Sequence, residues 1–375
     1  MVHVCSNGLQ LFPDTNETRI FLQNLSRLRS VYEPYHGGIC LTICVFGVVT
    51  NVINVIVLSK RQMRSSVNII LVGIALCDMG TMASYIVYLL HFVVQEGTCL
   101  SLLYSYAWML YLVVHMLVSN TLHATSLWLA VVMACIRTVT LRERSVTSRW
   151  MNVHVARKVC TVTFVVVQLF CVPMLFSNQI FDISHEVANN TCNEESVSEN
   201  ASMSTRASTY TIRVSDCRLY IGVLWMNGIL FKTIPCVALS LFIGSLIYTV
   251  RNARQRRDSL MPLNFHSSAS SAGIRRYDRT TIMLVVVLLL FLISELPQGI
   301  VVLLSAIFVA DVQRYVYPNI GNFLDLLSLV NSSVTFILYC SMSDKFRQAF
   351  WQVLLPKKVY LKWYVRNLGS NVIRR

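Results

Sequence analysis

The sequence predicts an all-α membrane protein: a seven-transmembrane helix bundle with a short amphipathic eighth helix and an extracellular N-terminus. Three observations predict this class: seven long apolar stretches, few charged residues, and Lys and Arg gathered on one side of those stretches. Of the 375 residues, 55% are hydrophobic and 13% are charged, whereas a soluble domain carries about 25% charged residues. About 20 apolar residues in a helix cross the hydrocarbon core, so the lipid bilayer is an expected partner.

The expected spans are about 36–59, 66–94, 104–141, 155–178, 219–250, 280–310 and 316–341. The third apolar stretch starts near residue 101 and is too long for one untilted crossing, so residues 100–105 are expected in an extracellular loop or cap. Residues 1–35 would form an extracellular tail. Because residues 1–33 hold no continuous apolar stretch, we expect no cleavable signal peptide and a first span that acts as its own insertion signal.

Residues 342–375 are expected to form an amphipathic helix followed by a basic cytoplasmic tail. In the segment SDKFRQAFWQVLL, the aromatic residues Phe346, Phe350 and Trp351 fall near helical spacing, with Lys345 and Arg347 opposite them. A helix with this pattern lies in the plane of the membrane surface.

Lys and Arg concentrate in the loops after the first, third and fifth spans and in the C-terminal tail. Seven arginines lie in the Ser-rich loop from Arg251 to Arg279. Cytoplasmic loops carry the Lys and Arg excess, which places the N-terminus outside and the C-terminus inside. The formal net charge of +14 would indicate nucleic acid in a soluble protein, but topology explains it here, and we expect no nucleic-acid partner. For the Ser-rich loop, attraction to anionic lipid and docking of a partner both stay open.

Four Asn-X-Ser/Thr sequons agree with this orientation. They begin at Asn16, Asn24, Asn189 and Asn200, all on the predicted outer side, and we therefore predict a glycoprotein. Four sequons on the predicted outer side are stronger evidence for this orientation than a single sequon would be. A fifth, at Asn331, lies inside the last span, out of reach of glycosylation, and is expected to be structural.

Four of the twelve cysteines lie on the predicted outer side, where disulfides persist. They are Cys5, Cys99, Cys192 and Cys217, and four cysteines allow three pairings. We favour Cys99–Cys192, which would hold the second outer loop to the top of the third span, with Cys5–Cys217 as a second bridge. The other eight lie in or beside apolar spans and are expected to pack as small hydrophobic residues.

Several spans carry a polar side chain at middle depth. Asp78, near the centre of VNIILVGIALCDMGTMASYIVYLLHFVV, is the most costly of them to bury in hydrocarbon. The others are Asn51, Ser126, Asn331 and Ser332. Two interpretations stay open: a plain hydrogen-bond network between helices, or a site in which Asp78 and neighbouring oxygens hold a small cation such as sodium.

A second polar set lies nearer the outer half and comprises Lys232, Glu295, Asp325 and His123. Lys232 lies three residues before Pro235 and Glu295 two before Pro297, and each proline permits a kink. Lys232 and Glu295 form either a static buried ion pair, which often adds little stability, or a switch. In the switch, a cationic ligand competes for Glu295 and lets the sixth span move about its kink.

No catalytic constellation is present in the sequence. The chain has no HExxH, no GxSxG, no phosphate-binding Gly loop and no Cys/His metal spacing. We therefore expect a protein that is not an enzyme and that holds no cofactor apart from the sodium ion considered above. The two halves also show no inverted repeat with broken helices, as many transporters do.

The seven spans, the outer N-terminus and the depths of the polar residues resemble the rhodopsin-like G-protein-coupled receptors, over about residues 35–352. The likeness is carried by GVVTNVINVIVL, NIILVGIALCD, Pro235, Pro297 and NSSVTFILY. More narrowly, HATSLWLAVVMACIRT, NGILFKTIPC, SELPQGIVVLLSAIF and LDLLSLVNSSVTFILYCSMSDKFRQ resemble the FMRFamide and myosuppressin receptor group, in particular its nematode dromyosuppressin-receptor-related branch.

Four features depart from the superfamily pattern, and one of them is that VTFVVVQLF in the fourth span lacks the common tryptophan. Where D-R-Y is usual, residues 136–138 read I-R-T, which keeps the arginine that meets the G protein but not the acid that restrains it. Glu295 stands where a tryptophan usually precedes the sixth-span proline. Residues 335–339 replace N-P-x-x-Y and keep only the tyrosine. The resemblance assigns Arg137 and Tyr339 to G-protein coupling and leaves the level of basal activity open.

The resemblance implies an extracellular amidated neuropeptide of the FMRFamide-like class, ending in Arg-Phe-amide or a similar tail, and a heterotrimeric G protein inside. An arginine guanidinium binds a carboxylate through two parallel hydrogen bonds. Glu295 and Asp325 are the intramembrane acids available to it. The aromatic candidates for the phenylalanine ring are Tyr85 and Trp225, with Tyr88, Trp108 and Tyr111.

We therefore expect a multi-pass receptor of the plasma membrane in which the peptide shifts a pre-existing equilibrium. Two alternatives stay open. A nematode serpentine chemosensory receptor of the W type, for an unknown ligand, shares the runs SSVNII, IALCD, IRT and KTIPC. The ending LDLLSLVNSSVTFILYC favours the peptide group. The alternative from another class is a membrane transporter or channel.

Overall fold

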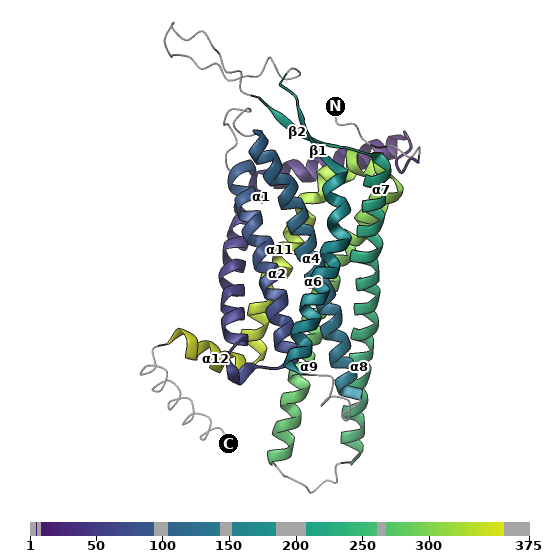
Figure 1. The fold of residues 1–375 in the computed structure, drawn as a ribbon. Coiled ribbons are helices and arrows are strands. Elements are labelled where there is room, and N and C mark those ends of the chain that lie inside the picture. Colours follow the sequence, from purple (N-terminus) through teal and green to yellow (C-terminus); the bar gives the residue numbers. More distant parts are fainter. Residues whose placement is uncertain are drawn as a thin grey trace, which may run out of the picture.

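The computed structural model describes residue 5 and residues 9–93, 104–142, 152–184, 208–260 and 268–355. Within these ranges, seven helical spans are long and apolar enough to cross a membrane. The amphipathic helix α12 (Asp344–Leu354) follows the last of them and leads away to one side from the inner end of the bundle (Figure 1). The predicted fold class is therefore confirmed.

Three of the seven spans change helical pitch along their length. The elements are α1 (Asn16–Leu58), α2 (Ser66–Tyr88) with a π-helical turn (Leu89–Val93), α4 (Tyr106–Arg142), α6 (Val153–Ser177), α7 (Cys217–Met226) with a π-helical segment (Asn227–Thr233) and α8 (Ile234–Leu260), α9 (Ser268–Ile307), and α10 (Val309–Asp311) with a π-helical turn (Val312–Val316) and α11 (Tyr317–Met342). A short 3-10 helix (Arg61–Met63) joins α1 to α2.

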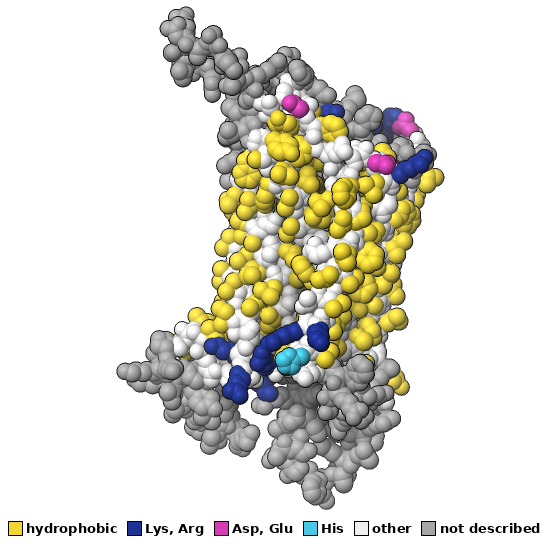
Figure 2. Space-filling view, viewed as in Figure 1, with side chains coloured by type: hydrophobic (Ala, Val, Ile, Leu, Met, Phe, Trp, Pro, Cys, Tyr) yellow, Lys and Arg dark blue, Asp and Glu magenta, His cyan; other side chains and the backbone are white. Residues whose placement is uncertain are grey.

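The helix α2 lies at the centre of one side of the bundle, in contact with α1, α4 and α6, while α11 packs between α1 and α9. The larger hydrophobic core fills the inner half, around Leu127, Met133 and Leu288. On the face shown in Figure 2, the outward side chains are also apolar and form a broad band that Lys and Arg border at the cytoplasmic end. A band of this kind is what a helix bundle presents to lipid.

Two short strands, β1 (Asn178–Asp182) and β2 (Tyr210–Val214), form an antiparallel pair at the extracellular end, with Asn178 opposite Val214 (Figure 1). The Tyr210 N–H donates to the Tyr104 carbonyl at 2.9 Å, which holds the pair against the start of the third span. The sequence analysis did not predict these strands. Residues 185–207, which contain Cys192, Asn189 and Asn200, lie outside the described residues, and so does Cys99; the Cys99–Cys192 bridge stays a prediction.

The first helix differs most from expectation, because it begins at Asn16 rather than near residue 36. Thr15 caps it by accepting a hydrogen bond from the Thr18 N–H at 3.3 Å. Its outer part lies across the extracellular end of the bundle before the helix turns down into the membrane (Figure 1), and the turn is explained by Pro34 inside the helix. We call residue 5 and residues 9–35 the strap.

The strap is fastened to the bundle at three places. Cys5 forms a disulfide with Cys217 at the start of α7. The backbone N–H groups of Leu11 and Phe12 donate to Asp311 Oδ2 at 2.6 and 3.1 Å. Near its other end, the rings of Tyr32 and Phe323 stack at 4.3 Å. The side chains of Asn16 and Asn24 are exposed on the strap, and their glycosylation stays a prediction.

The close approach of α1 to α2 and α11 requires a glycine at position 47. A Cβ there would lie 2.9 Å from Met82 Cε and 3.3 Å from Ser333 Cβ, whereas a Cβ at Gly38 in the same helix would meet nothing within 4 Å. Met82 is fully buried, so its sulfur and terminal methyl group would have to repack among other buried side chains. We expect Gly47→Val to cost about 1–3 kcal/mol, the usual cost of overpacking, and Gly38→Val to be close to neutral. Thermal unfolding of the two variants in detergent would measure the difference; equal midpoints would contradict this account.

Candidate functional site

The π-helical segment Asn227–Thr233 places Lys232 inside the bundle. Pro235 lacks the N–H of a regular helix, and single π-helical turns are common where the ordinary ladder is interrupted near a functional site. The Thr233 hydroxyl donates to the Gly228 carbonyl at 2.8 Å within this segment.

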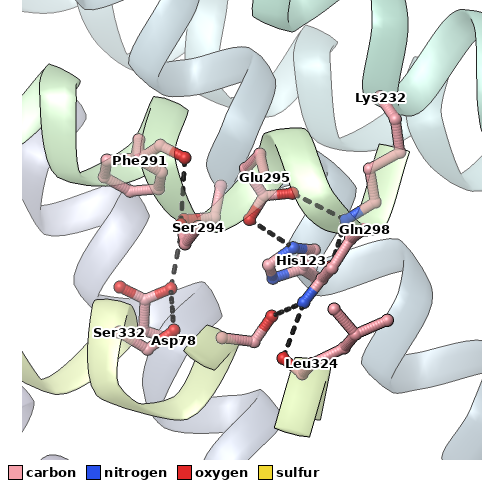
Figure 3. Close-up of polar contacts among 11 residues, drawn as sticks. Asp78, His123, Lys232, Phe291, Ser294, Glu295, Gln298, Leu324 and Ser332 are labelled. Atoms are coloured by element: carbon pink, nitrogen blue, oxygen red, sulfur yellow. Dashed lines mark hydrogen bonds and ion pairs between the residues drawn. The ribbon is translucent and has the colours of Figure 1, made fainter. Parts of the chain in front are cut away.

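Lys232 and His123 both contact Glu295, which is fully buried in α9 (Figure 3). The Lys232 ammonium donates to Glu295 Oε2 at 2.6 Å. His123 Nε2 lies 2.9 Å from Glu295 Oε1, which is within ion-pair distance but without hydrogen-bond alignment. We call these three residues the ion triad, and it joins the third, fifth and sixth spans.

Gln298 extends the ion triad to the seventh span. Its side-chain carbonyl accepts a second hydrogen bond from Lys232, at 2.7 Å. Its amide nitrogen donates to the Leu324 carbonyl at 2.9 Å and to the Ser328 hydroxyl (Figure 3). One polar chain therefore connects four spans at the level of the Pro297 kink. Sequence reasoning missed Gln298; the signal that could have found it is an amide directly after Pro297 in an apolar run.

Asp325 lies apart from the ion triad, in α11. Its Oδ2 accepts a hydrogen bond from the Tyr85 hydroxyl at 3.2 Å. Among the described side chains, no Lys or Arg lies within ion-pair distance of it. Sequence reasoning assigns similar roles to Asp325 and Glu295, but their surroundings in the structure are very different.

A layer of aromatic rings lies beside Asp325, between α2 and α4. We call Tyr85, Tyr88, Tyr111 and His115 the aromatic layer. Tyr88 lies 5.3 Å from Tyr85 and is stacked on His115 at 5.3 Å between ring centroids. His115 Nδ1 is 2.6 Å from the Ser84 hydroxyl, and the Tyr111 hydroxyl donates to the Ser84 carbonyl at 2.6 Å. Sequence reasoning did not single out His115. Trp108 stacks on His91 at the edge of the layer, and Trp225 is 39% exposed on α7, away from it.

The residues predicted at middle depth do meet one another. Asp78 is buried, and its Oδ1 accepts hydrogen bonds from Ser126 at 3.1 Å and Ser332 at 3.3 Å. The Asn51 amide donates to the Ser332 carbonyl at 3.0 Å, and Asn331 is buried beside it in α11. Asp78 Oδ2 has no hydrogen-bond partner among the described side chains. An orphaned carboxylate oxygen beside two hydroxyls fits a small cation, because hard cations take oxygen ligands.

At the cytoplasmic end, Arg137 is partly buried near the end of α4. The hydroxyl of the next residue, Thr138, donates to the Ala134 carbonyl at 2.9 Å and so stays within its own helix. Phe336 packs on Phe346 and Phe350 of α12, with ring centroids 6.0 and 5.6 Å apart. The side chain of Tyr339 lies outside the described residues.

Seven crossings around an internal polar chain, with basic inner loops, define a seven-helix membrane receptor. Residues 39–357 match the family described as serpentine type 7TM GPCR chemoreceptor Srw, and the chain belongs to this family of G-protein-coupled receptors. It is accordingly a multi-pass protein of the plasma membrane and a receptor, not an enzyme.

Relatives of the chain include receptors named for peptides. The chain is 32% identical to the G-protein coupled receptor dmsr-1 of Caenorhabditis elegans, over 93% of this chain and 75% of that protein. It is 25% identical to the sex peptide receptor of Drosophila melanogaster, over 86% and 73% of the two chains. It is also 25% identical to the FMRFamide receptor of Drosophila melanogaster, over 94% of this chain and 60% of that protein. The chain groups with these receptors within the superfamily.

Proposed function

We propose that this receptor responds to an extracellular amidated neuropeptide of the FMRFamide-like class and passes the signal to a heterotrimeric G protein. The observation that carries the proposal is Asp325, a carboxylate without a cationic partner among the described side chains, which lies beside the aromatic layer in the outer half of the bundle. A peptide ending in Arg-Phe-amide supplies one cation and one ring to such a place. The names of two relatives, the FMRFamide receptor and the sex peptide receptor, support a peptide ligand.

The signal would travel through a change in population between two arrangements of the spans. A ligand shifts such an equilibrium only by its differential affinity for the two states. The ion triad and Gln298 join four spans at the Pro297 kink, so a peptide bound above them acts on the element that sets the angle of the sixth span. The inner ends of α8 and α9 would then open, and Arg137 and Tyr339 would meet the G protein.

A second candidate is a receptor for a chemosensory ligand, which the description of the matching family favours. A transporter or channel has no support from the relatives, which are receptors. The decisive assay is nucleotide exchange on heterotrimeric G protein by purified receptor in lipid discs, with each peptide supplied as the amide and as the free acid. We expect exchange with the amide only, and loss of it in Arg137→Gln. Exchange driven by small volatile or water-soluble molecules and by no peptide would favour the second candidate, whereas a ligand-gated current without G protein would contradict both.

We also propose that sodium binds at Asp78, with the hydroxyls of Ser126 and Ser332 as further oxygens. The ion would supply the positive charge that the orphaned Oδ2 lacks and would join α2, α4 and α11. Replacing NaCl by an equal concentration of choline chloride is expected to change the peptide EC50 severalfold in the wild type. Asp78→Asn should remove that dependence, because it removes the charge that holds the ion. A sodium dependence that survives in Asp78→Asn would place the ion elsewhere.

A further inference from the structure

We propose that Asp325, and not Glu295, is the carboxylate that binds the arginine of the peptide, with the rings of Tyr85, Tyr88 and His115 as the walls of this arginine subsite. The inference rests on the proposed function, since it assumes a peptide with an arginine near its amidated end. The sequence alone leaves Asp325 and Glu295 as equal candidates for binding the arginine, and this inference assigns the role to Asp325.

Glu295 is a poor acceptor for an incoming guanidinium because a lysine ammonium occupies one of its oxygens and a histidine ring lies against the other. Lys232 occupies Oε2 at 2.6 Å, and His123 lies 2.9 Å from Oε1. The carboxylate is fully buried, and the Lys232 side chain is only 11% exposed. A guanidinium would have to displace the ammonium and leave it buried without its partner, and an uncompensated buried charge is strongly unfavourable.

Asp325 has the opposite environment. Its one hydrogen bond among the described side chains comes from a neutral group, the Tyr85 hydroxyl at 3.2 Å. The residue is partly exposed and has no hydrogen bond or ion pair to the ion triad among the described side chains, so a ligand that binds it leaves the triad in place. A buried or half-buried carboxylate needs a cation or several hydrogen bonds to offset its desolvation, and a peptide guanidinium supplies both.

The rings beside Asp325 suit the flat shape of a guanidinium. Tyr85, Tyr88 and His115 lie within 5.3 to 5.8 Å of one another, between ring centroids. The bonds through Ser84 fix the orientation of His115 and Tyr111. Arginine stacks on aromatic faces while its fork pairs with a carboxylate, which a lysine cannot do in the same way.

The strap is held against the helix that carries Asp325. Tyr32 stacks on Phe323, two residues before Asp325 in α11, and the inner face of the strap passes over the outer end of the same helix (Figure 1). A peptide whose arginine reaches Asp325 would therefore pass close to the strap.

The test pairs two receptors with two peptides. An amidated peptide that activates the wild type is compared with the same peptide carrying citrulline, an uncharged analogue of the same shape, in place of arginine. In the wild type, citrulline is expected to weaken binding about 10- to 100-fold, the range for a charge-assisted hydrogen bond. In Asp325→Asn the arginine peptide is expected to weaken by a similar factor, and the two peptides should then bind within about threefold of each other.

Two matched variants show whether the effect belongs to Asp325. Asp311→Asn removes another outer acid, and Glu295→Gln removes the acid of the ion triad; both are expected to keep the preference for arginine in the receptor that reaches the surface. If Asp325→Asn fails to fold, Asp325→Glu, which keeps the charge, and Tyr88→Leu, which removes a wall, take its place. The first should keep the preference and the second should reduce it severalfold.

Two results would overturn the assignment. One is a preference for arginine over citrulline that persists in Asp325→Asn and disappears in Glu295→Gln. The other is a wild type that binds both peptides equally. A wild type that responds to no amidated peptide would instead refute the proposed function, and this inference with it.

Discussion

Glu295→Gln is expected to leave little folded receptor at the cell surface. The substitution removes the charge that faces Lys232 at 2.6 Å and His123 at 2.9 Å, and Lys232 is almost completely buried. Removing one partner of a buried ion pair costs about 3–5 kcal/mol, because the other charge stays buried without compensation. Whole domains are stable by only about 5–15 kcal/mol. Surface labelling in intact cells and thermal unfolding in detergent would measure the loss.

The matched control for this substitution is the same chemical change at an exposed pair. Glu33 pairs with Arg29 at 2.7 Å on the strap, where the two side chains are 47% and 38% exposed. Exposed pairs contribute about 0–1 kcal/mol, so Glu33→Gln should leave surface expression almost unchanged. Equal losses in the two variants would show that burial of the ion triad is not what makes Glu295 important.

Removing both charges should restore the stability that Glu295→Gln alone loses. In Lys232→Met with Glu295→Gln, neither member of the pair is left as a buried charge without its partner, and replacing a buried pair by uncharged groups is often neutral. We expect the double variant to be more stable than Glu295→Gln alone, which is the mark of coupled residues in a double-mutant cycle. Additive losses would mean that the two side chains act separately.

The sequence predicted the class of fold and the depth of the polar residues because both depend on local signals. Apolar length shows where each span lies, and a carboxylate such as Asp78 stands out in an apolar run at any orientation of its helix. The pair of Lys232 and Glu295 was also expected, because each lies just before a proline in a neighbouring span. The structure agrees on the contact and adds His123 and Gln298 to it.

Contacts that depend on how each span is rotated about its axis could not be predicted from the sequence. The hydrogen bond of Tyr85 to Asp325 joins residues 240 positions apart in the sequence, and that of Leu11 to Asp311 joins residues 300 positions apart. A transmembrane helix is apolar on nearly all sides, so its hydrophobic pattern does not show which face meets which neighbour. For this reason Asp325 and Glu295 look equivalent in the sequence although their surroundings differ.

The outer part of α1 was missed for a different reason. Residues 16–35 contain several charged and polar residues, so a search for apolar stretches leaves them out. The residues of this segment that are partly buried do recur at helical spacing, at Thr18, Leu22, Leu25, Arg29 and Tyr32. A period of 3.6 residues is the signal of an amphipathic helix, and together with the Thr15 cap it could have identified the strap.

Removing the Cys5–Cys217 disulfide is expected to cause the second largest loss of stability, after Glu295→Gln. The bridge closes a loop of 212 residues, and the chain-entropy relation gives about 5 kcal/mol for a loop of that length in a soluble protein. The value here should be smaller, because spans that stay inserted in the bilayer already restrict the unfolded chain. We expect Cys5→Ser and Cys217→Ser to lower the unfolding temperature equally, and the double variant to lower it no further. Cys340→Ser, at a free and partly exposed cysteine, is the control.

The bridge also determines how firmly the rest of the strap is held. While it is intact, the N-terminal end cannot leave, so the hydrogen bonds of Leu11 and Phe12 to Asp311 form at a high effective concentration. Asp311→Asn alone should therefore change little, whereas Asp311→Asn with Cys5→Ser should release the strap and expose residues 9–35 to protease. Variants are preferable to a reducing agent, which would act on every disulfide of the outer face. If Cys5→Ser with Asp311→Asn resists protease as the wild type does, the stacking of Tyr32 on Phe323 and the turn at Pro34 are sufficient to hold the strap in place.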